Sequence, residues 1–248
     1  MNNRPTILIT RPMKSGDPTE YTYQWGEQIS NMVKEYGYNL IDIKKNDVTY
    51  QNVSQLLDKH HPRLYIHIGH GCPASLQGQK ECIITRRFEM DELLSMQNFR
   101  EIVMPLIYAS GCKSSCMSTP DICNPLCIND TNLSLLKGTI VYTIACYSSL
   151  QLGKCAVKYG TDCYVGFNDL MLFPVDDKGS QDIFKNVHVT FIKELLNGKT
   201  IEEAEQQTNK YEDVLIKFYI DTKYISLPLL WNKIYRRVLG NREARIYT

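Results

Sequence analysis

The chain has 248 residues, of which 43% are hydrophobic and 22% are charged, and its formal net charge at pH 7 is +1. This composition predicts a globular protein, and we expect one domain over residues 1–248, with two small domains as the alternative. The near-zero charge gives no reason to expect nucleic acid as a partner, and no apolar run reaches the roughly 20 residues of a membrane span. Nine cysteines without an export signal indicate a cytoplasmic protein with reduced thiols.

The first third of the chain alternates apolar runs with segments of helical period. The predicted strands are Thr6–Thr10, Tyr38–Ile43 and Arg63–His70, and the predicted helices are Thr19–Tyr36 and Val53–Lys59. This order of strand, helix, strand, helix, strand is typical of a doubly wound sheet.

The middle of the chain is less regular until a second strand–helix–strand unit begins. Short strand or helix patterns occupy 81–85, 91–96 and 102–109, and a cysteine-rich insertion loop covers about 110–130. The unit that follows consists of a strand, a helix and a strand at Ile140–Ala145, Leu150–Tyr159 and Cys163–Phe167. A helical connection of this length normally joins two parallel strands.

The C-terminal part is mainly helical. We expect a helix at Asp182–Asn197, a second from a capping box at Thr200 to Tyr219, and a short helix or strand within Leu227–Leu239. Together the elements predict an α/β fold of three layers, with a mostly parallel central sheet and helices on both faces.

Two apolar strands end in residues that could react. The stretch RLYIHIGHG ends at His70 and Gly71, and the stretch YTIAC ends at Cys146. Ligands bind beyond the carboxyl ends of parallel strands, so both residues are expected on one edge of the sheet. A histidine beside a cysteine can take the thiol proton and so activate the sulfur as a nucleophile. The backbone N–H groups of Gly71 and Cys146 could form an oxyanion hole.

These two motifs, IHIGHG and YTIAC, in this order on strand ends, resemble the caspase-like cysteine peptidases, which include caspases, metacaspases, legumain, gingipains, clostripain and separase. The resemblance extends over about residues 6–167. It implies an endopeptidase with a Cys–His dyad, in which Cys146 is the nucleophile, His70 transfers the proton, no cofactor is needed for catalysis, and proteins or peptides are the substrates. The Gln-Ala-Cys-x-Gly signature of caspases is missing, so their preference for aspartate is not expected here.

Four cysteines in the insertion loop are regularly spaced as C-x3-C-x6-C-x3-C, at Cys112, Cys116, Cys123 and Cys127. Four thiolates match the ligand number of a structural Zn²⁺ site, although C-x2-C is the commoner spacing. Free thiols and disulfides are the alternatives. Cys112 also follows an apolar run and is a rival nucleophile, but Pro105 interrupts that run.

Acidic residues follow the strand that ends at Phe167. Asp169 is the first of them, and Asp176 and Asp177 come later in the same segment. A carboxylate near the cleft would favour Arg or Lys at the P1 position of a substrate, and Asp169 is the candidate substrate-binding residue. The other functional classes are a non-catalytic caspase-like interaction module with a zinc-stabilised loop and a flavodoxin-like small-molecule enzyme. No glycine-rich phosphate loop follows any of the predicted strands, which argues against the flavodoxin-like enzyme.

Overall fold

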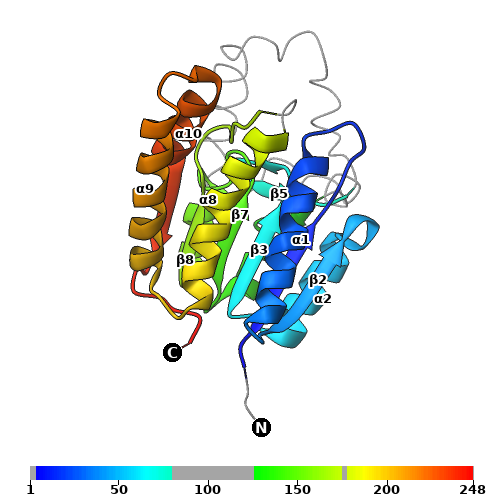
Figure 1. Cartoon of the computed structure of the whole chain (residues 1–248). Coiled ribbons are helices and arrows are strands. Elements are labelled where there is room, and N and C mark those ends of the chain that lie inside the picture. Colours follow the sequence, from blue (N-terminus) through cyan, green and yellow to red (C-terminus); the bar gives the residue numbers. More distant parts are fainter. Residues whose placement is uncertain (1–3, 80–125, 175–177, 248) are drawn as a thin grey trace.

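A six-stranded sheet forms the centre of the computed structural model, which describes residues 4–79, 126–174 and 178–247 (Figure 1). Its strand order is β2-β1-β3-β7-β8-β9, and only the last pair, β8 with β9, is antiparallel. The strands are β1 (Thr6–Arg11), β2 (Asn39–Lys44), β3 (Leu64–Ile68), β7 (Ile140–Ile144), β8 (Cys163–Phe167) and β9 (Arg236–Gly240). The expected α/β class and mostly parallel sheet are therefore confirmed.

Helices cover both faces of this sheet and complete three layers (Figure 1). One face carries α1 (Thr19–Glu35), α8 (Lys178–Leu196), α9 (Ile201–Phe218) and α10 (Lys223–Tyr235). The other face carries α2 (Tyr50–His60), α7 (Leu152–Lys158) and the 3-10 turn η4 (Leu133–Leu136), while a shorter turn, η1 (Lys45–Asp47), follows β2. A second sheet joins that layer, with the order β4 (Gly71–Cys72), β5 (Ser75–Gln77) and β6 (Leu126–Ile128).

The central strands are apolar throughout because both of their faces are covered. Every residue of β3, β7 and β8 is buried. Successive side chains of a strand pack against opposite helical layers. Ile66 packs toward α1 and α8, whereas Tyr65 packs toward α2 and α7. A continuous apolar run is the pattern that a parallel strand between two helical layers requires.

Several element boundaries differ from the sequence predictions. The strand before His70 ends at Ile68, so His70 lies beyond the sheet edge. The stretch predicted as one short element over 227–239 contains most of α10 and most of β9, because the chain turns back at Arg236 to pair with β8. The capping box at Thr200 is confirmed by its reciprocal hydrogen bonds with Glu203.

The cysteine-rich insertion is described only at its end. Residues 126–128, which were expected in a loop, form strand β6 and pair with β5. The patterns predicted at 81–85, 91–96 and 102–109 lie outside the described residues, as do Cys112, Cys116 and Cys123.

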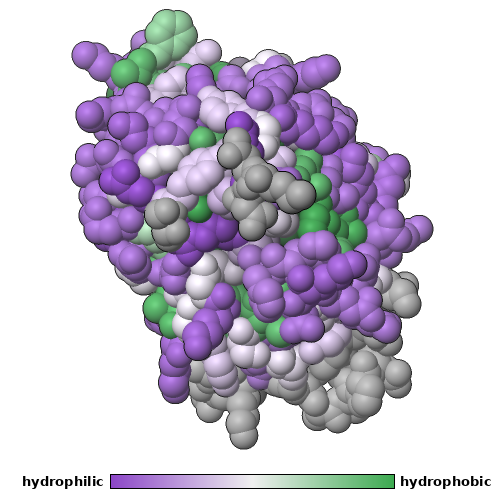
Figure 2. Space-filling model, turned by 90° about the horizontal axis from the view of Figure 1, so that it is seen from below, coloured by the Kyte–Doolittle hydropathy of each residue, from purple (hydrophilic) through white to green (hydrophobic). Residues whose placement is uncertain are grey.

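One further finding concerns the helices, and another concerns the face opposite the candidate residues. Every helix in the described ranges is too short or too polar to traverse a bilayer. The face that holds the amino-terminal ends of the parallel strands is covered mainly by hydrophilic residues, with smaller apolar areas between them (Figure 2). The candidate residues lie at the opposite edge, beyond the carboxyl ends of β3 and β7.

Candidate functional site

The pairing of β3 with β7 brings the two predicted motifs together. These strands are neighbours, parallel and in register, with Ile68 opposite Ile144. The segments that leave them therefore start at the same edge of the sheet. Their backbones touch, since a Cβ atom placed on Gly71 would lie 2.5 Å from the carbonyl oxygen of Cys146. A glycine is needed at position 71 because any side chain would separate the two segments.

A tight turn presents Cys146 at the end of β7. Tyr147 has a φ of 55°, in the left-handed region that non-glycine residues rarely adopt. The turn is held by Ser148, whose hydroxyl donates to the Ala145 carbonyl over 2.9 Å, and by the Ser149 N–H, which donates to Phe167 in β8 over 2.9 Å. Backbone strain of this kind persists where surrounding contacts enforce it, and it is concentrated at functional sites.

Asp17 is a site residue that the sequence analysis missed. Its Oδ2 lies 2.7 Å from Nε2 of His70, although 53 positions separate the two residues. Partial burial raises the pKa of Asp17, but hydrogen bonds from His70 and the Thr19 backbone outweigh this effect and lower the pKa to about 2. Asp17 is therefore a carboxylate at neutral pH. It lies in a turn-rich loop after β1, where no sequence pattern distinguishes it from a solvated acid.

The Cys146 thiol is partly buried and contacts the loop after β8. The backbone N–H of Met171 donates to its sulfur over 3.3 Å. Burial raises the pKa of the thiol, the Met171 N–H lowers it, and the nearby Asp169 carboxylate raises it, with a net upward shift. In the described part of the chain no hydrogen bond joins the thiol to the His70 ring, whose Nε2 is bonded to Asp17.

Asp169, the predicted substrate-binding residue, is held against this site. Only 5% of its surface is exposed, and its Oδ1 accepts the Leu170 N–H over 2.8 Å. Its carbonyl accepts the N–H of Tyr147 over 3.0 Å, which ties the loop to the turn that carries Cys146. Asp176 and Asp177 lie outside the described residues.

A second cysteine–histidine pair lies in the core and is inert. Sγ of Cys127 is 3.6 Å from Nδ1 of His67, and both residues are fully buried. Burial raises the pKa of Cys127 to about 12 and lowers that of His67 to about 4, so both groups are neutral at pH 7. The His67 ring also hydrogen-bonds Thr10 and the carbonyl oxygen of His70. This pair therefore supports the site without offering a reactive thiol.

The surroundings of Cys127 do not favour the predicted zinc site. Its thiol donates to the carbonyl oxygens of Leu76 and Gln77, whereas a zinc ligand is a thiolate. Among the described residues, no three His, Cys, Asp or Glu side chains are close enough to hold a metal ion. Because the other three cysteines of the motif lie outside those residues, the zinc site stays a prediction.

The remaining histidines have structural positions. His60 ends α2 and His61 follows it with a φ of 41°, so both precede β3 and lie at the edge opposite Cys146. His188 is buried on α8, where its Nδ1 is 2.9 Å from the hydroxyl of Tyr142. Of the five histidines in the chain, His70 alone is both partly exposed and near Cys146.

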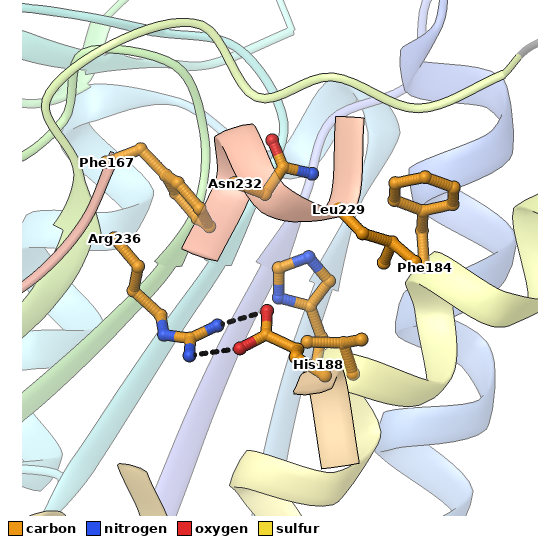
Figure 3. A pocket seen from close by; sticks show the side chains of 8 residues that line it. Phe167, Phe184, His188, Leu229, Asn232 and Arg236 are labelled. Carbon is orange, nitrogen blue, oxygen red and sulfur yellow. Dashed lines mark hydrogen bonds and ion pairs between the residues drawn. The ribbon is translucent and has the colours of Figure 1, made fainter. Parts of the chain in front are cut away.

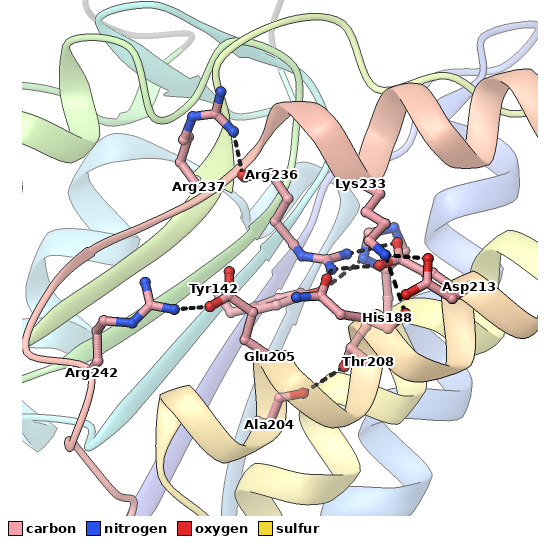
Figure 4. A network of polar contacts seen from close by, with 12 residues as sticks. Tyr142, His188, Ala204, Glu205, Thr208, Asp213, Lys233, Arg236, Arg237 and Arg242 are labelled. Carbon is pink, nitrogen blue, oxygen red and sulfur yellow. Dashed lines mark hydrogen bonds and ion pairs between the residues drawn. The ribbon is translucent and has the colours of Figure 1, made fainter.

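A small pocket lies beneath α10, and His188, Asn232 and the ion pair of Glu212 with Arg236 line part of it (Figure 3). The same pair belongs to a polar network that connects α9 with α10 and β9 (Figure 4). Both charges are neutralised within the pair, and aromatic and aliphatic side chains close much of the rest. We therefore place the candidate site at the edge that carries Cys146.

A comparison with models of known protein families finds no match, and neither does a comparison with curated proteins.

Proposed function

We propose that this protein is a cytoplasmic cysteine endopeptidase of the caspase-like type, with Cys146 as nucleophile and His70 as proton-transferring partner. The observation that supports it most strongly is the register of β3 and β7, which brings the His70-Gly71 and Cys146 segments into backbone contact. A histidine with a partly buried carboxylate partner can take up the proton of a nearby cysteine, and these are groups that activate a thiol for acyl transfer.

Asp17 defines the role of His70 in this proposal. In the neutral tautomer that donates Nε2–H to Asp17, Nδ1 is the basic nitrogen of the ring. The carboxylate also stabilises the imidazolium that forms when His70 takes a proton. Because the pKa of Cys146 is raised, its resting form is the thiol, and proton removal by His70 accompanies the attack.

The reaction then follows from these roles. The Cys146 sulfur bonds to the peptide carbonyl carbon as its proton passes to His70. The C–N bond breaks, the amine leaves with that proton, and a thioester remains on Cys146. Water attacks the thioester, gives one proton back through His70 to the sulfur, and releases the carboxylic acid. Backbone N–H groups at Gly71 and Cys146 are proposed to stabilise the tetrahedral oxyanion, and removal of one such donor costs about 3–4 kcal/mol in general.

A preference for basic P1 side chains is the finer part of the proposal. Asp169 is buried beside Cys146, and an anionic group there can pair with a guanidinium or ammonium in a partly dry cleft. Replacement of Asp169 by Asn should lower kcat/KM for Arg and Lys substrates much more than for Leu substrates. Equal losses for both kinds of substrate would indicate that Asp169 holds the turn that carries Cys146 and does not select the substrate.

The test uses fluorogenic peptides ending in Arg, Lys, Asp, Asn or Leu, together with an acyloxymethyl ketone label. Wild type should cleave at least one series and bind the label, whereas Cys146→Ala should do neither. His70→Ala should lose cleavage and keep its fold. Cys72→Ser, which changes another partly buried thiol near the same edge, is the matched control and should stay active. Cleavage that persists in Cys146→Ala would refute the proposal, and a folded wild type with no cleavage would favour the interaction module.

Zinc in the insertion loop is a separate structural proposal. Elemental analysis of the purified chain should return about one Zn²⁺ if Cys112, Cys116, Cys123 and Cys127 share an ion. Because Cys127 is a buried, protonated thiol in β6, its replacement by Ser is a useful check: unchanged zinc content would remove Cys127 from the ligand set.

A further inference from the structure

Helix α10 holds the loop that follows β8 through hydrogen bonds from its last turns. The indole Nε1–H of Trp231 donates to the carbonyl of Leu170 over 3.0 Å. Asn232 binds both backbone groups of Leu172, at 2.8 Å and 2.6 Å, and the Asn168 N–H donates to Tyr235 over 3.0 Å. The loop is thus attached to α10 on both sides of Met171.

One peptide group of this loop contacts both α10 and the candidate nucleophile. The carbonyl that accepts from Trp231 and the N–H that donates to Cys146 belong to the same peptide unit, between Leu170 and Met171. A trans peptide is planar, and its C=O and N–H bonds point in opposite directions. A hydrogen bond that fixes the carbonyl therefore also aims the N–H. It also polarises the amide, which strengthens the bond on the other side.

We infer that Trp231 is a positioning residue for Cys146, acting through the Leu170–Met171 peptide group to stabilise the thiolate. The hydrogen-bond donor, the indole N–H of Trp231, belongs to helix α10 and not to the loop. The ring is fixed in place, since Trp231 packs on Tyr235 with centroids 4.4 Å apart. A hydrogen-bond donor to sulfur favours the ionised form over the neutral thiol. Loss of the indole N–H should therefore make the thiol harder to ionise.

The consequence for catalysis rests on the proposed function, but the effect on the thiol does not. Among the described residues, the charge that acts on the sulfur is that of Asp169 on the same loop, and the His70–Asp17 pair lies in segments that leave the same edge of the sheet. None of them is altered when Trp231 is replaced by Phe. A change in the titration of Cys146 would therefore show the effect of losing the hydrogen bond from Trp231 to the Leu170–Met171 peptide group. The rate of alkylation by iodoacetamide, followed on the Cys146 peptide by mass spectrometry from pH 6 to 10, measures that titration.

We expect Trp231→Phe to raise the apparent pKa of Cys146 by about 0.5–1 unit, which lowers its alkylation rate at pH 7 roughly 3- to 10-fold. Tyr235→Phe removes a hydroxyl from the stacked neighbour without touching the peptide, and its profile should match wild type. An unchanged profile in a folded Trp231→Phe protein would overturn the inference. So would an equal shift in Tyr235→Phe, because the effect would then belong to packing in general.

Asn232→Leu provides a second variant should Trp231→Phe not fold. It removes both hydrogen bonds to Leu172, which lie one and two peptide units further along, and should shift the Cys146 titration in the same direction by a smaller amount. A folded Asn232→Leu protein with the wild-type profile would overturn the coupling of α10 to the thiol. If peptide cleavage is absent while these shifts are present, the proposed function fails and the role of Trp231 stands.

Discussion

Replacement of Glu212 by Gln should destabilise the protein more than any change to its surface charges. Glu212 on α9 and Arg236 at the start of β9 form a two-point ion pair, with N···O distances of 2.8 Å and 2.6 Å (Figure 4). Their side chains are only 1% and 2% exposed. Burial would lower the pKa of Arg236, but the charge and hydrogen bonds of Glu212 outweigh it and raise the pKa.

The size of the effect follows from what remains after the substitution. Arg236 stays charged because its pKa is high, and it keeps only the bond from Nη2 to Asn209 and weaker contacts with the new amide. Its Nε already lacks a hydrogen-bond partner among the described atoms. Removing one partner of a buried ion pair costs about 3–5 kcal/mol, because the other charge is left without compensation in a low-dielectric site. We expect a loss of that order in the free energy of unfolding.

Urea denaturation at pH 7, followed by circular dichroism, measures the difference. Asp213→Asn is the matched control. Asp213 lies on the same helix as Glu212, its side chain is 66% exposed, and the change breaks its ion pair with Lys233 of α10. That change should cost less than about 1 kcal/mol. The double variant Glu212→Leu with Arg236→Met removes both charges and should recover most of the loss. A cost below about 1 kcal/mol for Glu212→Gln would refute the reasoning.

The other predictions concern the site, acid stability and a helix end. Gly71→Ala would place a Cβ 2.5 Å from the Cys146 carbonyl and should lower kcat/KM about 100-fold, so wild-type activity would contradict the contact. Burial, helped by the charge of Arg236, lowers the pKa of His188 from 6.5 to about 3, so the unfolded chain binds a proton between these values that the folded chain does not. The contribution of His188 to the free energy of unfolding should be complete above pH 6.5 and decrease as the pH falls, with a loss of about 2 kcal/mol at pH 5. His188→Gln should flatten this part of the curve of stability against pH. Thr200→Ala removes the capping box and should cost about 1 kcal/mol of unfolding free energy in urea, whereas Lys199→Ala should be nearly neutral.

The local sequence pattern determined most of the secondary structure. The bounds of β8 agree with the predicted Cys163–Phe167, and α1 differs from its prediction by one residue. Buried parallel strands have apolar residues on both faces, so their pattern stands out from that of amphipathic helices. The placement of His70 and Cys146 at one edge was also predictable, because parallel strands end on the same side of a sheet.

Only the tertiary structure decided which distant groups meet. Asp17 reaches His70 across 53 positions, and Trp231 reaches Leu170 across 61, through loops whose paths no local periodicity describes. The division of the last predicted element into α10 and β9 has the same origin, since Arg236 begins a strand only because the edge of β8 is there to pair with. Periodicity reports which face of an element is buried. The partner of each polar group depends on strand order, register and loop path, which are set by packing of the whole chain.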